Sequence, residues 1–127
     1  HTGGVTVSGG VGGGAGGADA TREVGCWGWL LEFEDGTRVY HSGDTDLFSD
    51  MALVRERWAP TVAVLPIGGH FTMGPADAAR AVALIGAETV IPVHYGTFPI
   101  LTGTPAELQA ATPATVVPLE PGETWGA

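Results

Sequence analysis

The sequence predicts an α+β fold in which a β-hairpin precedes alternating helices and strands. Two extended, apolar-rich segments lie on either side of an Asp-Gly turn signal at Asp35 and Gly36, which indicates the hairpin. Beyond it, short continuous apolar runs alternate with longer segments of helical periodicity. This order predicts a sheet that helices cover on at least one face.

The expected elements begin near Val24, where side chains able to form a core first appear. Pro60 should end the first helix, Pro75 suits the first turn of the second, and Thr104 with Glu107 matches a capping box for the third. In chain order, we expect strands at 26–33 and 38–40, a helix at 49–58, a strand at 62–65, a helix at 75–85, a strand at 89–93, a helix after Thr104, and a strand at 115–119.

The first part of the chain has a different composition. Residues 2–18 are mostly glycine with Ala, Val and Ser, which bury too little side-chain surface to offset their backbone entropy. We therefore divide the chain into a flexible Gly-rich segment, 1–23, and a folded part, 24–127. Whether the flexible segment is a plain linker or a mobile lid over a site stays open.

Charge and cysteine content restrict the function classes. Fourteen acidic residues against five basic ones disfavour nucleic acid and anionic membranes as partners. A single cysteine cannot form an intrachain disulfide, and no apolar run approaches the roughly 20 residues of a membrane span. We expect a cytoplasmic setting. Because the chain starts with His1 rather than methionine, we also expect that an upstream segment has been removed or left out.

Three polar segments follow the ends of expected strands. They are 43–45, 68–74 and 94–97. If their strands are parallel neighbours, the three loops meet at one edge of the sheet, where ligand sites of α/β sheets form. Taken singly, Asp44 could be only a turn-forming residue and His94 only a satisfied core histidine.

Taken together, three motifs resemble a known family. They are HSGDTDLF at 41–48, LPIGGHFTMGP at 65–75 and IPVHYGTFP at 91–99. The chain, from about Gly25 to its end, resembles a family of bacterial and archaeal metal-dependent hydrolases of the metallo-β-lactamase superfamily, related to the ascorbate-6-phosphate lactonases. The resemblance implies that this chain is the C-terminal half of an αββα sandwich whose metals lie at one edge between the sheets.

The resemblance also implies metal ligands. Asp44 matches the carboxylate that bridges two divalent ions, and His94 matches the last histidine ligand. His1, followed by Thr2, matches a further histidine ligand, although it could also be an incidental chain-end residue. Two ions are expected, zinc first, with manganese or iron as alternatives. Thr45 and Tyr95 are candidates for holding the ligands from the outer shell.

The superfamily's His-x-His-x-Asp-His motif is absent from this sequence, which has four histidines in all. His1, Asp44 and His94 alone give an incomplete shell for two metals. The remaining ligands are expected from a partner, an N-terminal half that is a separate chain or a cleaved fragment. Self-association into a homo-oligomer stays open.

The implied function is hydrolysis of a small ester, lactone or phosphoester by a metal-bound hydroxide. Asp44 would be catalytic, and His70, on the loop that resembles the family's substrate-facing loop, would contact the substrate or donate a proton unless it is only a surface residue. His41 and the tryptophans are expected to pack. The alternative function is a noncatalytic module or assembly subunit with the same fold, which metal analysis would separate from the enzyme.

Overall fold

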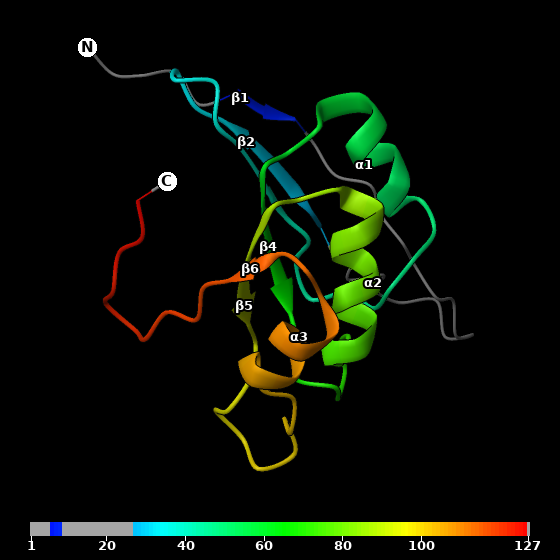
Figure 1. Ribbon diagram of the computed structural model, residues 1–127, viewed down its shortest axis with the longest axis vertical. Helices are drawn as coiled ribbons and strands as arrows, with labels where there is room; N and C mark the ends of the chain where they lie inside the picture. Colours follow the sequence, from blue (N-terminus) through cyan, green and yellow to red (C-terminus); the bar gives the residue numbers. More distant parts are fainter. Residues whose placement is uncertain (1–5, 9–26, 127) are drawn as a thin grey trace, which may run out of the picture.

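Among the residues that the computed structural model describes, 6–8 and 27–126, the strands form one mixed sheet and three helices accompany it (Figure 1). The strands lie side by side in chain order, from β1 to β6. Their bounds are β1 Thr6–Ser8, β2 Trp29–Glu32, β3 Arg38–His41, β4 Val62–Pro66, β5 Thr89–Val93 and β6 Thr115–Val116. The helices are α1 Met51–Trp58, α2 Pro75–Ile85 and α3 Pro105–Ala111.

Along its width the sheet changes once from antiparallel to parallel pairing. β1, β2 and β3 pair antiparallel, whereas β3, β4, β5 and β6 pair parallel. The parallel part requires crossovers, which α1, α2 and α3 supply. Consequently the carboxyl ends of β3, β4 and β5 lie at the same edge, as the sequence predicts.

One face of the sheet forms the core. Leu30, Tyr40, Ala63 and Val90 are aligned across four strands and are all buried. Figure 1 shows α1 and α2 on one side of the sheet, and α3 packs against α2 and β6. The largest fully buried side chains come from the strands, the helices and the loop after β4; they include Met51, Leu65, Ile67, Met73, Ile85 and Leu108.

The opposite face is less covered. Trp29, His41, Val64 and Ile91 are aligned one residue away from the buried row, and each stays partly or largely exposed. Trp29 has 45% of its surface exposed. A sheet whose described residues bury one apolar face and leave the other partly exposed is half of a sandwich, as the resemblance implies.

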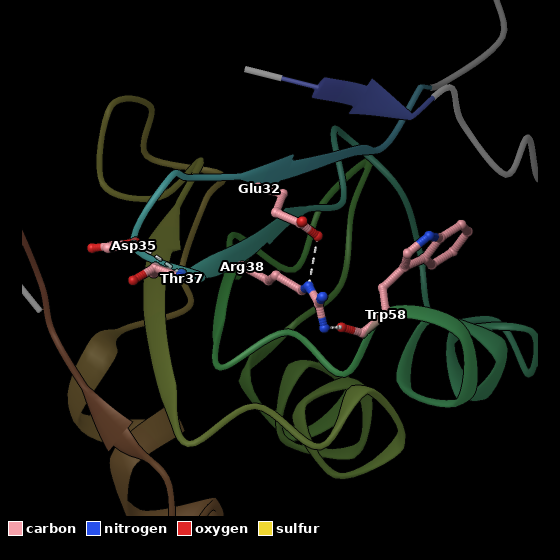
Figure 2. Close-up of polar contacts among 5 residues, drawn as sticks. All are labelled: Glu32, Asp35, Thr37, Arg38 and Trp58. Atoms are coloured by element: carbon pink, nitrogen blue, oxygen red, sulfur yellow. Dashed lines mark hydrogen bonds and ion pairs between the residues drawn. The ribbon is translucent and has the colours of Figure 1, made fainter. Parts of the chain in front are cut away.

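Arg38 joins three elements near the hairpin (Figure 2). Its Nε lies 2.7 Å from Glu32 Oε2 on β2, and its Nη1 donates to the Trp58 carbonyl oxygen at 3.1 Å, at the end of α1. In the turn, Asp35 accepts from the Thr37 N–H at 2.9 Å, and this bond holds the pKa of the Asp35 carboxyl below its usual value. The antiparallel pairing of β2 and β3 across this turn confirms the Asp-Gly hairpin. The exposed ion pair between Arg38 and Glu32 adds only about 0–1 kcal/mol to the stability.

Several expected elements differ from those observed. Thr6–Ser8 forms β1 inside the segment expected to be flexible, because it can pair with β2. β6 ends at Val116 rather than 119, since Pro118 has no N–H to continue the ladder. Trp27 is 61% exposed, so the expectation that it and Trp29 pack is wrong for the described part of the chain. His1 and the boundary at 23/24 lie outside the described residues.

Candidate metal centre

At the carboxyl edge of the parallel strands, hydrogen bonds join the ends of β3, β4 and β5 and two of the loops that follow them, and Gly68 lies close to His94 of the third loop. The Ser42 N–H donates to Val64 O at 3.1 Å, and the Ile67 N–H donates to Val93 O at 3.0 Å, which extends the sheet pairing by one residue on each strand. The Met73 N–H then donates to the Thr45 carbonyl oxygen at 3.3 Å. The expected convergence of these loops is therefore confirmed.

Asp44 projects from a tight turn after β3. Gly43 has a φ of +71°, a conformation that favours glycine, and the Thr45 N–H donates back to Gly43 O at 3.0 Å. The Asp44 side chain is 68% exposed. The turn thus holds the carboxylate at the edge of the sheet, where most of the side chain is exposed.

His94 follows β5 directly and has an unusual backbone. Its φ is +55°, a region that costs a residue other than glycine about 1–3 kcal/mol and that is concentrated at functional sites. Gly68 passes close by, so that a Cβ added to Gly68 would lie 2.4 Å from the His94 carbonyl oxygen. The close approach of these two loops therefore depends on glycine at position 68.

His94 Nε2 and Asp44 Oδ2 lie 4.0 Å apart. Zinc binds nitrogen and carboxylate oxygen at about 2.0–2.2 Å, so two ligands of one tetrahedral ion would lie about 3.4 Å apart, a separation that a small movement of either side chain would reach. The His94 Nδ1 is buried and has no hydrogen-bond partner among the described residues. His94 therefore faces the Asp44 carboxylate through Nε2, and its Nδ1 is shielded from water. This arrangement fits a metal ligand whose Nδ1–H would donate to an acceptor in the outer shell.

The centre is incomplete in the described part of the chain. No group of three or more His, Cys, Asp or Glu side chains within 6–8 and 27–126 is placed to hold a metal ion. Asp44 and His94 supply two donors, whereas a zinc ion commonly takes four. His1, the third expected ligand, lies outside the described residues.

The loop between β4 and α2 presents His70 and Phe71. Ile67 and Met73 are fully buried at its two ends, and the Gly69 N–H donates to Met73 O at 3.0 Å. At its tip the rings of His70 and Phe71 meet edge to face with centroids 4.1 Å apart. Phe71 has a φ of +66° and is 82% exposed, so an anchored loop holds an apolar ring in solvent.

Thr45 and Tyr95 do not hold His94 as outer-shell residues within the described structure. The Thr45 hydroxyl donates to the Asp46 carbonyl oxygen at 3.0 Å instead. Tyr95 packs against the core, and burial, aided by the charge of Glu120, raises the pKa of its hydroxyl. Neither side chain reaches the unpartnered Nδ1 of His94.

His41 has a contact that the sequence analysis missed. It is partly buried, as expected for a packing residue, but its Nδ1 accepts the Gly43 N–H at 3.0 Å. Burial lowers the pKa of His41, and the charge of Asp44 partly opposes that shift. The only signal in the sequence was its position two residues before a glycine of the site loop.

A hollow of about 390 Å³ lies at the opposite end of the sheet, lined by residues of 82–88 and 112–114. These residues precede β5 and β6, so the hollow lies by the amino ends of the strands, away from Asp44 and His94. Ligand sites in such sheets form at the carboxyl ends. We therefore place the candidate centre at the loops rather than at the hollow.

No helix in the part of the chain covered by 6–8 and 27–126 is long and apolar enough to cross a bilayer.

Comparison with known proteins finds a matching family and similar sequences and structures. Residues 5–95 match the β-lactamase superfamily domain. A UPF0173 metal-dependent hydrolase of Koribacter versatilis is 48% identical over 99 residues, which are 77% of this chain and 42% of that protein. A UPF0173 metal-dependent hydrolase of Myxococcus xanthus is 52% identical over 102 residues, 76% of this chain and 37% of that protein.

A solved structure is also similar. A metallo hydrolase of the archaeon Ignicoccus hospitalis superimposes with a TM-score of 0.72 and 39% identity, covering 94% of this chain and 50% of that protein. The chain spans about two fifths of the length of the two curated relatives and half of the archaeal one. The more specific relation to ascorbate-6-phosphate lactonases stays a prediction.

Gly68→Ala tests whether the loop approach positions His94. We measure metal binding on the completed protein, meaning this chain joined to the segment that the Koribacter relative carries outside the matched region. A Cβ at 68 would meet the His94 carbonyl oxygen at 2.4 Å, so His94 must move and metal affinity should fall about tenfold. The matched control is Gly74→Ala, whose Cβ makes an ordinary 3.6 Å contact. Equal metal affinity in the two variants would contradict this positioning of His94.

Proposed function

Since this chain belongs to the metallo-β-lactamase superfamily, we propose that it forms the part of a metal-dependent hydrolase that carries Asp44 and His94 as metal ligands. The observation that supports this most is the pair itself, with Nε2 and Oδ2 4.0 Å apart at the carboxyl edge of the parallel strands. The backbone strain at His94 supports it further, because strain of this kind is retained at functional sites.

Each ligand has a separate task in this proposal. The Asp44 carboxylate has two oxygens and therefore can bridge two cations, while His94 binds as the neutral imidazole through Nε2. When bound, the divalent ions acidify water so that it can attack near neutral pH, and they stabilise the negative charge that develops on the substrate. Zinc is the first expectation for imidazole and carboxylate donors, with manganese or iron as alternatives.

We infer that the missing ligands come from an N-terminal segment with the His-x-His-x-Asp-His motif, with His1 as a further ligand. Two observations support this inference. The described residues give an incomplete shell, and the sheet face with Trp29, Val64 and Ile91 is partly exposed. A second sheet packed on that face would complete both the core and the centre.

The proposed substrate is a small ester, lactone or phosphoester. The acidic composition gives no basic track for a nucleic acid, so a small molecule bound among the loops is favoured. His70, held beside Phe71 on an anchored loop, is the proposed residue that contacts the substrate or donates a proton to it. The cytoplasm is the proposed compartment.

Asp44→Asn in the completed protein tests the bridging ligand. Asn keeps the size of Asp but loses the charge, so metal affinity should fall more than about 100-fold and hydrolysis of generic esters and phosphodiesters should be lost. His94→Ala should also lose metal. The measurements are metal content, expected at about two equivalents in the wild type, and the rate of hydrolysis.

The matched control is Asp46→Asn, which removes the same charge two residues away. The side-chain oxygen of the asparagine can still accept the Leu47 N–H that Asp46 Oδ1 accepts at 2.7 Å, so the local turn should persist. Metal content and activity should equal those of the wild type. If Asp44→Asn and His94→Ala also kept both, the site would be misassigned, and absence of metal from the wild type would favour the noncatalytic module.

His70→Ala separates a role toward the substrate from a role toward the metal. Because His70 lies at an exposed loop tip, its removal should leave metal content and unfolding temperature unchanged. If His70 donates a proton, kcat should fall about 100-fold or more. Phe71→Ala, on the same loop, controls for a general disturbance of the tip. An unchanged kcat and KM in His70→Ala would show that His70 is only a surface residue.

Removal of the added segment tests the need for a covering half. Alone, this chain should bind a hydrophobic dye, self-associate or unfold without a sharp transition, because one apolar sheet face is partly exposed among the described residues. The completed protein should be monodisperse and unfold cooperatively. Light scattering, dye binding and calorimetry provide the measurements. A monodisperse, cooperatively unfolding monomer of the chain alone would contradict the proposal.

A further inference from the structure

His41 is the last residue of β3 and lies beside the candidate centre. It is aligned with Trp29 on β2 and Val64 on β4, on the sheet face opposite the helices. Its side chain is partly buried, and Asp44, three residues later, is close enough for its charge to act on the imidazole. His41 therefore connects the end of a strand with the turn that carries a proposed ligand.

The backbone after His41 leaves the sheet in two steps. The Ser42 N–H still donates to Val64 O at 3.1 Å, which continues the ladder with β4. Gly43, with its φ of +71°, turns away, and its N–H donates to His41 Nδ1 at 3.0 Å rather than to a neighbouring strand. The Gly43 N–H, the first amide beyond the ladder with β4, thus has the His41 imidazole as its hydrogen-bond acceptor instead of a strand carbonyl.

This contact determines the protonation of the ring. A backbone N–H can only donate, so the Nδ1 must present a lone pair, and the neutral imidazole then carries its proton on Nε2. An imidazolium has a proton on both nitrogens and could not accept this bond. The partial burial of His41, which disfavours the charged form, is consistent with the neutral ring.

We propose that His41 is a positioning residue for Asp44, whose turn it holds by accepting the Gly43 N–H at Nδ1. Without that acceptor, the Gly43 amide loses its partner, and the turn that presents the Asp44 carboxylate loses a constraint. The inference rests on the proposed function of Asp44 as a ligand. It assigns His41 no contact with substrate or metal.

Three variants of the completed protein separate this role from packing. In His41→Asn the side-chain oxygen can take the place of Nδ1, whereas in His41→Gln the amide lies nearer the place of Nε2. His41→Leu keeps apolar volume and has no acceptor. We expect metal affinity within about threefold of the wild type for Asn, and a loss of about tenfold or more for Gln and Leu. A role in packing alone predicts the opposite order, with Leu the least affected, and that order would overturn the proposal.

A second measurement does not depend on metal or on activity. Nitrogen NMR of the metal-free wild type reports which ring nitrogen of His41 carries the proton. The expected result is a proton on Nε2 and an unprotonated Nδ1 that accepts the hydrogen bond from the Gly43 amide. A proton on Nδ1 overturns the proposal even if every variant fails to fold. If the wild type shows the expected tautomer but Asp44→Asn retains metal, the proposed ligand role of Asp44 fails instead.

Discussion

The parallel pairing of β4 with both β3 and β5 is the constraint on which the rest of the structure depends. β4 lies between its neighbours with Ala63 and Leu65 fully buried, and its register aligns the ends of all three strands. The residues that directly follow β3 and β4, Ser42 and Ile67, each continue the sheet pairing by one more hydrogen bond. Asp44 and His94 are distant in sequence, and this register, together with the loop conformations at Gly43 and His94, brings Nε2 and Oδ2 to 4.0 Å. A shift of one residue in β5 would move His94 away from Asp44 and reverse which face is buried.

The proposed covering half would account for two features of the described residues, the partly exposed sheet face and the incomplete ligand shell. In a two-sheet sandwich with its centre at the edge between the sheets, each half contributes some of the ligands and one wall of the core. In this proposal the covering half would pack on the row with Trp29, Val64 and Ile91, and it would supply an acceptor for His94 Nδ1, which has no hydrogen-bond partner among the described residues. The assembly of the core and of the centre would thus be a single event, in which apolar burial drives the positioning of polar donors.

Local signals explain what the sequence predicted well. Pro75 and the Thr104–Glu107 capping box are self-contained, and α2 and α3 begin where these signals indicate. The strand β1 was not predicted, because its formation depends on pairing with β2 across residues 9–28 rather than on its own composition. The motifs singled out Asp44 and His94 as candidate ligands. They did not predict the left-handed backbone of His94 or its close approach to Gly68, because these two features arise from contacts between loops that are distant in sequence. The contact of His41 was missed because an imidazole can pack, donate or accept, and only the geometry of Gly43 decides among these.

The left-handed backbone at His94 also limits how this centre can change. β-Branched and bulky residues are strained at a φ of +55°, whereas Asn and Asp are, with His, the residues that adopt it most readily after glycine. Both replacements offer oxygen in place of nitrogen, and oxygen donors favour harder ions such as magnesium, calcium or manganese. The backbone conformation at one residue therefore restricts which substitutions are tolerated, and the substitutions that it tolerates best are those that would change the metal preference of the proposed centre.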